Sequence, residues 1–261
     1  DPAKIEVAIT PKTKAILVVH IFGQAADMDP IMKIAEKHNL LVIEDACESI
    51  CAKYKGKTVG TFGQSAVFAF YPNKQMTTGE GGMVCTNDKT VYEYCKSLRN
   101  QGREGMEWLD HKYLGYNYRL DEMSAAVGIA QLEKIDWFIK ERQKIADLYN
   151  KEFAKFSNLV KTPEVADGNV HTWFVYTVQM LNNNLDRNKV MLKLRDAGIS
   201  SKEYLPSIHL FEFYREKFGY VGGEFPTSEM VSNRSLALPF YIGLTGDDVK
   251  HIVSNLIKTL D

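Results

Sequence analysis

The first third of the chain carries its hydrophobic residues in short continuous runs. Residues 15–19 and 40–43 are apolar throughout, and between them residues 28–38 repeat their apolar positions with the period of a helix. Asp27 stands directly before that helical segment, where an N-cap residue is expected. Because fully apolar strands are typical of a sheet covered on both faces, the pattern predicts a strand–helix–strand unit of a parallel sheet.

Two more strands are predicted at residues 67–71 and 81–86, the second as an antiparallel edge strand that returns after a loop. Ligands of open α/β sheets bind outside the carboxyl ends of the strands. His20 and Asp45 follow the first two apolar runs, and Lys74 lies just past the third strand. We therefore expect a site at the sheet edge where these three residues meet.

The second half of the chain has a different pattern. Residues 121–156 predict a long helix or a kinked pair of helices, and residues 173–180 alternate like a half-buried antiparallel strand. Helices are predicted at residues 187–197, 228–236 and 246–260. The sequence thus predicts a large α/β domain at residues 1–156 and a smaller α+β domain at residues 157–261.

The composition narrows the class of protein. The 261 residues are 45% hydrophobic, and 32 Lys and Arg against 33 Asp and Glu leave no basic stripe for nucleic acid. No apolar run is long enough to span a bilayer, so a cytoplasmic protein with a small-molecule partner is expected. The spacing of the four cysteines matches no standard zinc site, which favours free thiols and predicts no metal.

Lys74 and Asp45 are the residues with the clearest chemistry. Most loop lysines are solvated surface charges and most strand-end aspartates cap turns, but these two are predicted at one sheet edge. A lysine that forms an imine and a carboxylate that holds a pyridinium nitrogen are the groups that pyridoxal 5′-phosphate (PLP) chemistry needs. Ala46 would offer a small, flat surface beside the ring. The pattern therefore predicts a PLP enzyme.

Six motifs in order extend this interpretation to a family. The chain resembles the DegT/DnrJ/EryC1/StrS family of PLP-dependent sugar aminotransferases from near residue 5 to beyond residue 155. The motifs are His20-x-x-Gly23, Val42-Ile-Glu-Asp45-Ala46, Phe68-Ala-Phe-Tyr-Pro-Asn-Lys74, Thr78-Gly-Glu-Gly-Gly82, Leu98-Arg-Asn-Gln-Gly102 and Gly115-Tyr-Asn117-Tyr-Arg119.

The resemblance implies an aspartate aminotransferase-like fold, a homodimer, and transfer of an amino group, usually from glutamate, to a nucleotide-linked keto sugar. By the same resemblance Lys74 is the imine lysine and Asp45 the partner of the pyridinium nitrogen. Asn117 would reach the cofactor phosphate of the neighbouring subunit, and His209 would line the sugar pocket.

Three departures from the family pattern bear on the cofactor site. Glu48 stands at the ring hydroxyl, where relatives commonly carry Gln or His, and Ala69 replaces a serine that binds phosphate in many members. Family members also begin with a segment that supplies further strands, a phosphate-binding turn and a stacking aromatic residue. Since that segment does not precede Asp1, we expect an incomplete large domain that binds PLP poorly by itself.

Two other functions remain open and one is set aside. PLP dehydratases of this family carry histidine in place of the lysine, whereas Lys74 is intact. A non-catalytic regulator or scaffold could retain the fold, and an absence of the yellow colour of the lysine-bound cofactor would identify it. A Rossmann site is set aside because residues 79–82 lack the G-x-G-x-x-G spacing and precede a strand.

Overall fold

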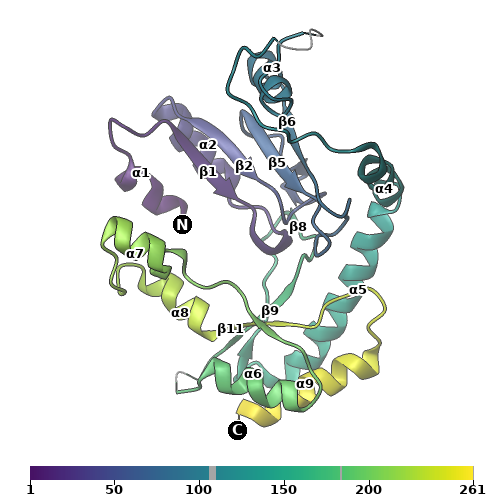
Figure 1. The fold of residues 1–261 in the computed structure, drawn as a ribbon. Coiled ribbons are helices and arrows are strands. Elements are labelled where there is room, and N and C mark those ends of the chain that lie inside the picture. The colour runs from purple at the N-terminus through teal and green to yellow at the C-terminus, as the bar shows by residue number, and fades with distance from the viewer. Residues whose placement is uncertain (106–109, 183, 261) are drawn as a thin grey trace. The chain divides into compact units, whose positions relative to one another are not determined.

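The computed structural model describes residues 1–105, 110–182 and 184–260 (Figure 1). The chain forms two compact units, of which the first comprises residues 1–139 and 165–174. The second comprises residues 140–164 and 175–261, so the boundary falls inside helix α5 (Ile135–Phe153). This division differs from the predicted one at residue 156, and residues 183 and 261 of the predicted second domain lie outside the described residues.

A four-stranded sheet forms the centre of the first unit, in the order β1-β2-β5-β6 (Figure 1). Its strands are β1 (Ala15–Val19), β2 (Leu41–Asp45), β5 (Ser65–Ala69) and β6 (Gly82–Thr86). The first three are parallel and β6 pairs with β5 antiparallel, which confirms the predicted mostly parallel sheet with an antiparallel edge. Strand β5 begins two residues earlier than expected, because Ser65 already pairs with Ile43 of β2.

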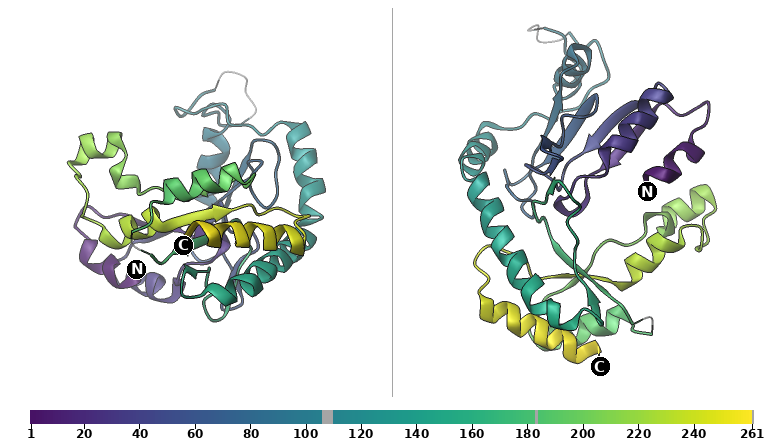
Figure 2. Two further views of the ribbon diagram at one scale, coloured as in Figure 1. Left: turned by 90° about the horizontal axis from the view of Figure 1, so that it is seen from below. Right: turned by 180° about the vertical axis from the view of Figure 1, so that it is seen from behind.

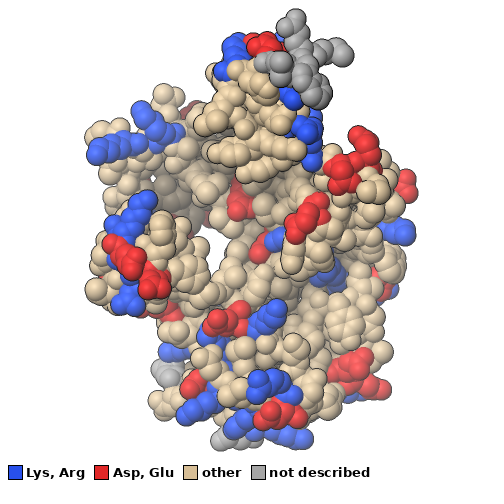
Figure 3. Space-filling model, viewed as in Figure 1, with Lys and Arg blue, Asp and Glu red and all other residues tan. Residues whose placement is uncertain are grey.

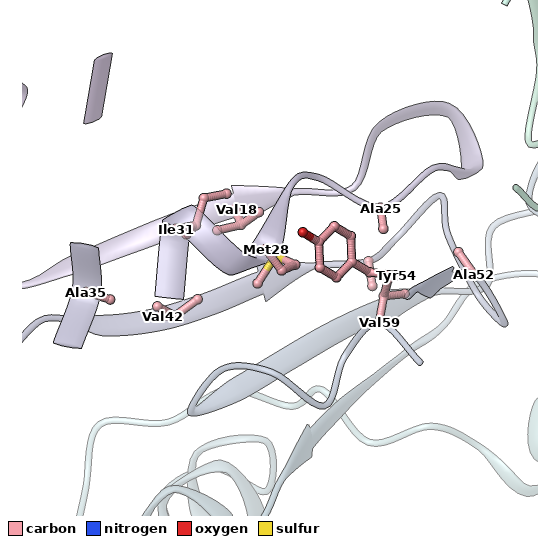
Figure 4. Close-up of a cluster of buried hydrophobic side chains, with 10 residues drawn as sticks. Val18, Ala25, Met28, Ile31, Ala35, Val42, Ala52, Tyr54 and Val59 are labelled. Carbon is pink, nitrogen blue, oxygen red and sulfur yellow. The ribbon is translucent and has the colours of Figure 1, made fainter. Parts of the chain in front are cut away.

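Helix α2 (Met28–Lys37) packs on this sheet as the helical periodicity predicted. Its buried residues Met28, Ile31 and Ala35 belong to one hydrophobic cluster with Val18 of β1 and Val42 of β2 (Figure 4). Burial of such side chains contributes about 1.5–3 kcal/mol each. The cluster therefore fixes the strands whose carboxyl ends carry His20 and Asp45.

The first unit contains further, mostly short elements. They are η1 (Pro2–Lys4), α1 (Ile5–Ala8), η2 (Ile21–Gly23), β3 (Lys53–Tyr54), β4 (Lys57–Thr58), α3 (Lys89–Leu98), α4 (Glu122–Leu132) and β8 (Asn169–Val170). Strand β3 pairs with both β4 and β8, so residues 165–174 return to the first unit from far along the chain. The predicted kinked pair of helices is confirmed as α4 and α5.

The second unit has its own four-stranded sheet, in the order β10-β11-β9-β7. Its elements are the end of α5, η3 (Ala154–Phe156), β7 (Val160–Lys161), β9 (Tyr176–Met180), α6 (Arg187–Asp196), β10 (Lys202–Glu203), η4 (Ile208–Leu210), α7 (Glu212–Phe218), α8 (Pro226–Arg234), β11 (Ser235–Leu238) and α9 (Gly246–Leu260). Helices α6 and α9 pack side by side, as Figures 1 and 2 show.

One prediction for the second unit is wrong at its end. The helix expected at residues 228–236 ends at Arg234, and Ser235–Leu238 form strand β11. All four residues of β11 are buried, and the strand pairs with β9 on one side and β10 on the other. Pairing on both edges overrides the local helical pattern, because it satisfies the backbone while burying both faces of the strand.

Charged side chains of both signs lie on the surface (Figure 3). Lys and Arg side chains are interspersed with Asp and Glu over the face shown in Figure 3. Among the described residues, no helix is both long enough and apolar enough to span a membrane. All four cysteines are free.

Candidate active site

Asp45 ends β2 at the carboxyl edge of the sheet. Val19 of β1 and Val67 of β5 stand beside it in register, and Asp45 Oδ1 accepts a hydrogen bond from the Cys47 backbone N–H at 3.1 Å. Ala46 is fully buried and its N–H donates to the Val67 carbonyl at 2.9 Å, which fixes the turn. The half-buried carboxylate is thus held rigidly at the predicted edge.

Cys47 is the only described residue that hydrogen-bonds to the Asp45 side chain. Burial and the neighbouring carboxylate raise the pKa of the Cys47 thiol to about 12, so this thiol stays neutral at physiological pH. An ionised carboxylate has about four acceptor positions. Asp45 can therefore accept a further N–H, such as that of a protonated ring nitrogen.

Lys74 lies in the loop after β5, where its backbone N–H donates to the Tyr71 carbonyl at 2.9 Å. Its Nζ atom is 3.6 Å from Glu48 Oε1 and 4.4 Å from the centroid of the Phe174 ring. The side chains of Lys74 and Glu48 are each only 14% exposed. The lysine amine is therefore held between a carboxylate and an aromatic face, at the end of the strand next to the one that carries Asp45.

The Glu48 carboxylate is also fixed by a backbone contact. Its Oε2 atom accepts a hydrogen bond from the Phe22 N–H at 3.0 Å. Burial raises the pKa of Glu48, while the Phe22 N–H and the charge of Lys74 oppose that rise. The structure thus brings the predicted residues Lys74 and Glu48 together, close to the turn that begins with Asp45 and Ala46.

Sequence reasoning missed the residues that support this pair. Gln75 is buried, and its Nε2 donates to the Glu48 carbonyl at 2.6 Å and to Thr172 Oγ1 at 3.2 Å. Thr172 and Phe174 come from a segment about a hundred residues downstream, where the Thr172 N–H donates to the Gly23 carbonyl at 2.8 Å. The one available signal was the position of Gln75 directly after Lys74.

His20 is fully buried and forms a hydrogen-bonded pair with Glu44. Its Nδ1 accepts from the Ala26 N–H at 3.0 Å, so the proton lies on Nε2, which donates to Glu44 Oε2 at 3.0 Å. Glu44 also accepts from the backbone N–H groups of Gly60, Phe62 and Gly63, at 2.6, 2.7 and 2.7 Å. This pair therefore supports the sheet edge from inside.

Glu44 is expected to contribute stability that depends on pH. Burial raises the pKa of Glu44, but the hydrogen bonds from His20 and three backbone N–H groups outweigh it and hold the pKa below its usual value. A carboxylate whose pKa is lower in the folded protein stabilises the fold when the pH is above its pKa in the unfolded chain. That stabilisation is lost as the pH falls through the pKa of the folded protein. Glu44→Gln turns an amide toward these donors and should cost about 2–4 kcal/mol at pH 7.

Urea unfolding at pH 7 and at pH 4 measures this cost. The difference between wild type and Glu44→Gln should shrink at the lower pH, because Glu44 takes up a proton in the unfolded chain before it does so in the folded protein. Glu36→Gln, on the exposed face of α2, is the matched control and should change little. An equal loss in both variants would contradict the structural role of Glu44.

Asn117 is exposed on the surface of the first unit. Its segment pairs with the end of α3 through an Asn100–Asn117 bridge, and the Tyr118 N–H donates to the Arg99 carbonyl at 2.8 Å. A Cβ atom on Gly102 would lie 1.8 Å from the Tyr113 carbonyl oxygen, which explains the glycine in that motif. An exposed side chain on a fixed backbone suits a role toward another subunit.

His209 belongs to the second unit, whereas the residues described so far belong to the first. Its Nε2 is 2.9 Å from Glu229 Oε1, and its ring stands edge-on to Tyr220 and Phe225. Glu229 also accepts from the Gly223 N–H at 2.8 Å, and nearby Glu224 accepts from the Val221 N–H at 2.8 Å. Because both carboxylates already hold backbone N–H groups, the cluster is explained as a clamp on residues 221–225.

The residues at the sheet edge fit PLP. Lys74 supplies a partly exposed amine, and Asp45 supplies a fixed carboxylate with acceptor capacity left. Glu48 places a second acidic group 3.6 Å from the amine. PLP carries an aldehyde, which reacts with an amine, and a basic ring nitrogen, which pairs with a carboxylate. Both protein groups are present at this edge of the sheet.

Comparison with known proteins agrees with this site. The model of the DegT/DnrJ/EryC1/StrS aminotransferase family matches residues 1–257. GDP-perosamine synthase of Caulobacter vibrioides is 38% identical over 261 residues, which cover 100% of this chain and 70% of that protein.

Two solved structures have the same fold. PseC of Helicobacter pylori, an aminotransferase involved in the biosynthesis of pseudoaminic acid, superposes with a TM-score of 0.91 at 26% identity, covering 100% of this chain and 70% of that one. DesV of S. venezuelae superposes with a TM-score of 0.90 at 31% identity, covering 100% of this chain and 69% of that one. The expected aspartate aminotransferase-like fold is confirmed by these neighbours. The chain belongs to the DegT/DnrJ/EryC1/StrS aminotransferase family.

Proposed function

We propose that this protein is a PLP-dependent aminotransferase that moves an amino group, from glutamate, to a keto sugar linked to a nucleotide. The observation that carries the proposal is the Lys74 amine beside Glu48, one strand away from the fixed Asp45 carboxylate, in a chain of this family. The relative named GDP-perosamine synthase supports a nucleotide-linked sugar as the substrate class. A cytoplasmic location is part of the same proposal.

Each residue at the sheet edge has a role in this proposal. PLP, when bound, would supply an aldehyde for the lysine amine and a ring that accepts electrons from the substrate carbon. Asp45 would hold a proton on the ring nitrogen, and Ala46 would leave room beside the ring. Lys74 Nζ would bind the aldehyde and, as a free amine, would carry the proton that moves between two carbons. Glu48 lies next to Lys74 and, by the family resemblance, would face the ring hydroxyl of PLP. By the same resemblance His209 would line the sugar pocket.

A substrate screen tests the function. Purified protein is supplied with a large excess of PLP, because weak binding is expected, together with glutamate and a set of nucleotide-linked keto sugars. It should form 2-oxoglutarate over many turnovers only with the correct sugar. A chain that acquires no yellow colour with PLP and forms no product would instead indicate a non-catalytic homologue. The Lys74→Ala variant is the negative control for non-enzymatic exchange.

We also propose a homodimer. Helix α4 carries exposed apolar side chains along its length, including Met123 at 81% and Ile129 at 64% exposure. Exposed apolar surface of this kind marks an interaction site. Asn117, which precedes α4, would reach the cofactor phosphate of the second copy.

Mixing inactive subunits tests the role of Asn117. Lys74→Ala and Asn117→Ala homodimers should each be inactive, whereas a verified heterodimer should recover part of the activity. One of its two sites then combines an intact Lys74 with an intact Asn117. Heterodimers without activity would show that Asn117 serves its own subunit.

A further inference from the structure

Gln75 is the most completely buried polar residue of the loop that carries Lys74. It is 4% exposed, and its side chain reaches two segments that are far apart in the sequence. Nε2 donates to the Glu48 carbonyl at 2.6 Å and to Thr172 Oγ1 at 3.2 Å. We propose that Gln75 is a positioning residue, which holds the Lys74 amine between Glu48 and Phe174. This inference rests on the proposed role of Lys74.

The orientation of the amide follows from its partners. A reversed amide would place Oε1 2.6 Å from the Glu48 carbonyl oxygen, where two acceptors repel. The N–H group therefore faces Glu48, and both donated bonds belong to one amide. Among the neutral side chains, only asparagine also has an NH2 group that can donate two hydrogen bonds, and asparagine is one methylene shorter.

Both partners of Gln75 lead back to the environment of Lys74. Glu48 places its carboxylate 3.6 Å from Lys74 Nζ, and the same residue offers its carbonyl to Gln75. Thr172 is fully buried and stands two residues before Phe174, whose ring lies 4.4 Å from Nζ. Gln75 thus joins the two segments that contact the amine.

Gln75 also has an acceptor without a partner. Its Oε1 atom is buried and receives no hydrogen bond from any described residue. An unsatisfied buried acceptor destabilises the fold, so Gln75 is not the best side chain at this position for stability alone. Gln75→Met removes both donated bonds and this acceptor while keeping a similar volume.

The test is competitive labelling of lysines in the chain by an amine reagent, read by mass spectrometry. The exposed Lys12 and Lys258 serve as internal references. Loss of the Gln75 bonds should raise labelling of Lys74 relative to these references by about fivefold or more, since one ordinary hydrogen bond corresponds to about that factor. The measurement needs neither cofactor nor turnover, so it can fail or succeed independently of the proposed aminotransferase activity.

Two comparisons separate positioning from general destabilisation. Met76→Ala removes buried packing from the same loop and leaves the Gln75 bonds in place. When Met76→Ala and Gln75→Met are compared under conditions of equal stability, Met76→Ala should raise the labelling of Lys74 less than Gln75→Met does. Thr172→Val should reproduce part of the Gln75→Met effect, whereas Thr172→Ser, which keeps the hydroxyl acceptor, should label like wild type.

The proposal is overturned by either of two results. One is Lys74 labelling that does not change in Gln75→Met. The other is an equal rise in Met76→Ala at matched stability, because any loosening of the loop would then suffice.

Discussion

Replacing Lys74 with alanine is expected to abolish covalent labelling of the protein by PLP and borohydride and to lower transamination by about 10³–10⁴-fold. The reason is geometric, because Lys74 Nζ is the amine that the structure holds at this sheet edge, beside Glu48 and Phe174. Peptide mapping after reduction identifies the labelled lysine, and a coupled assay for 2-oxoglutarate measures turnover.

Lys74→Arg separates loss of the amine from loss of the charge. Arginine keeps a cation near Glu48 and the Phe174 ring, so the fold should be less disturbed than by alanine, yet a guanidinium cannot form the bond to the cofactor. Lys57→Ala, an exposed lysine on β4, is the matched control and should keep full labelling at Lys74. Label that persists at another lysine in Lys74→Ala would refute the assignment.

The sequence predicted the sheet edge well because its strands are continuous apolar runs. The burial on both faces that such runs predict is wrong for the described residues, since Leu17, Val19 and Leu41 are exposed on one face of β1 and β2. Continuous apolar runs leave few alternatives for β1, β2 and β5, and a parallel connection places their carboxyl ends together. Asp45 and Lys74 could therefore be assigned to one edge before the structure was known. The motif glycines were also informative, since Gly102 permits a backbone approach that no Cβ atom allows.

The support around Lys74 could not be predicted in the same way. The contact between Gln75 and Thr172 joins residues that are 97 positions apart, and no local pattern encodes it. The return of residues 165–174 to the first unit has the same origin, because it depends on pairing of the short strands β3 and β8. The local helical pattern also gave a wrong prediction at Leu236. This residue was expected at the end of a helix, but it lies in strand β11, which pairs with β9 and β10.

Asp45→Asn is expected to leave the fold and the covalent site intact while slowing turnover by about 10²–10⁴-fold. The amide oxygen can still accept the hydrogen bond that the Cys47 N–H donates to Oδ1 at 3.1 Å, so the turn after β2 should keep its shape. What the substitution removes is the negative charge. A neutral amide cannot stabilise a proton on the ring nitrogen, and the substrate carbon then loses its electron acceptor.

Three measurements on one sample distinguish this role from structural damage. Thermal melting and borohydride labelling of Lys74 should match wild type, while the rate of the amino-transfer half-reaction falls. Asp121→Asn is the control, because Asp121 caps α4 through the Ser124 N–H at 2.9 Å and asparagine caps helices about as well. Turnover that is unchanged in Asp45→Asn would mean that another group holds the ring nitrogen, and lost labelling would mean that Asp45 positions the Lys74 loop rather than the ring.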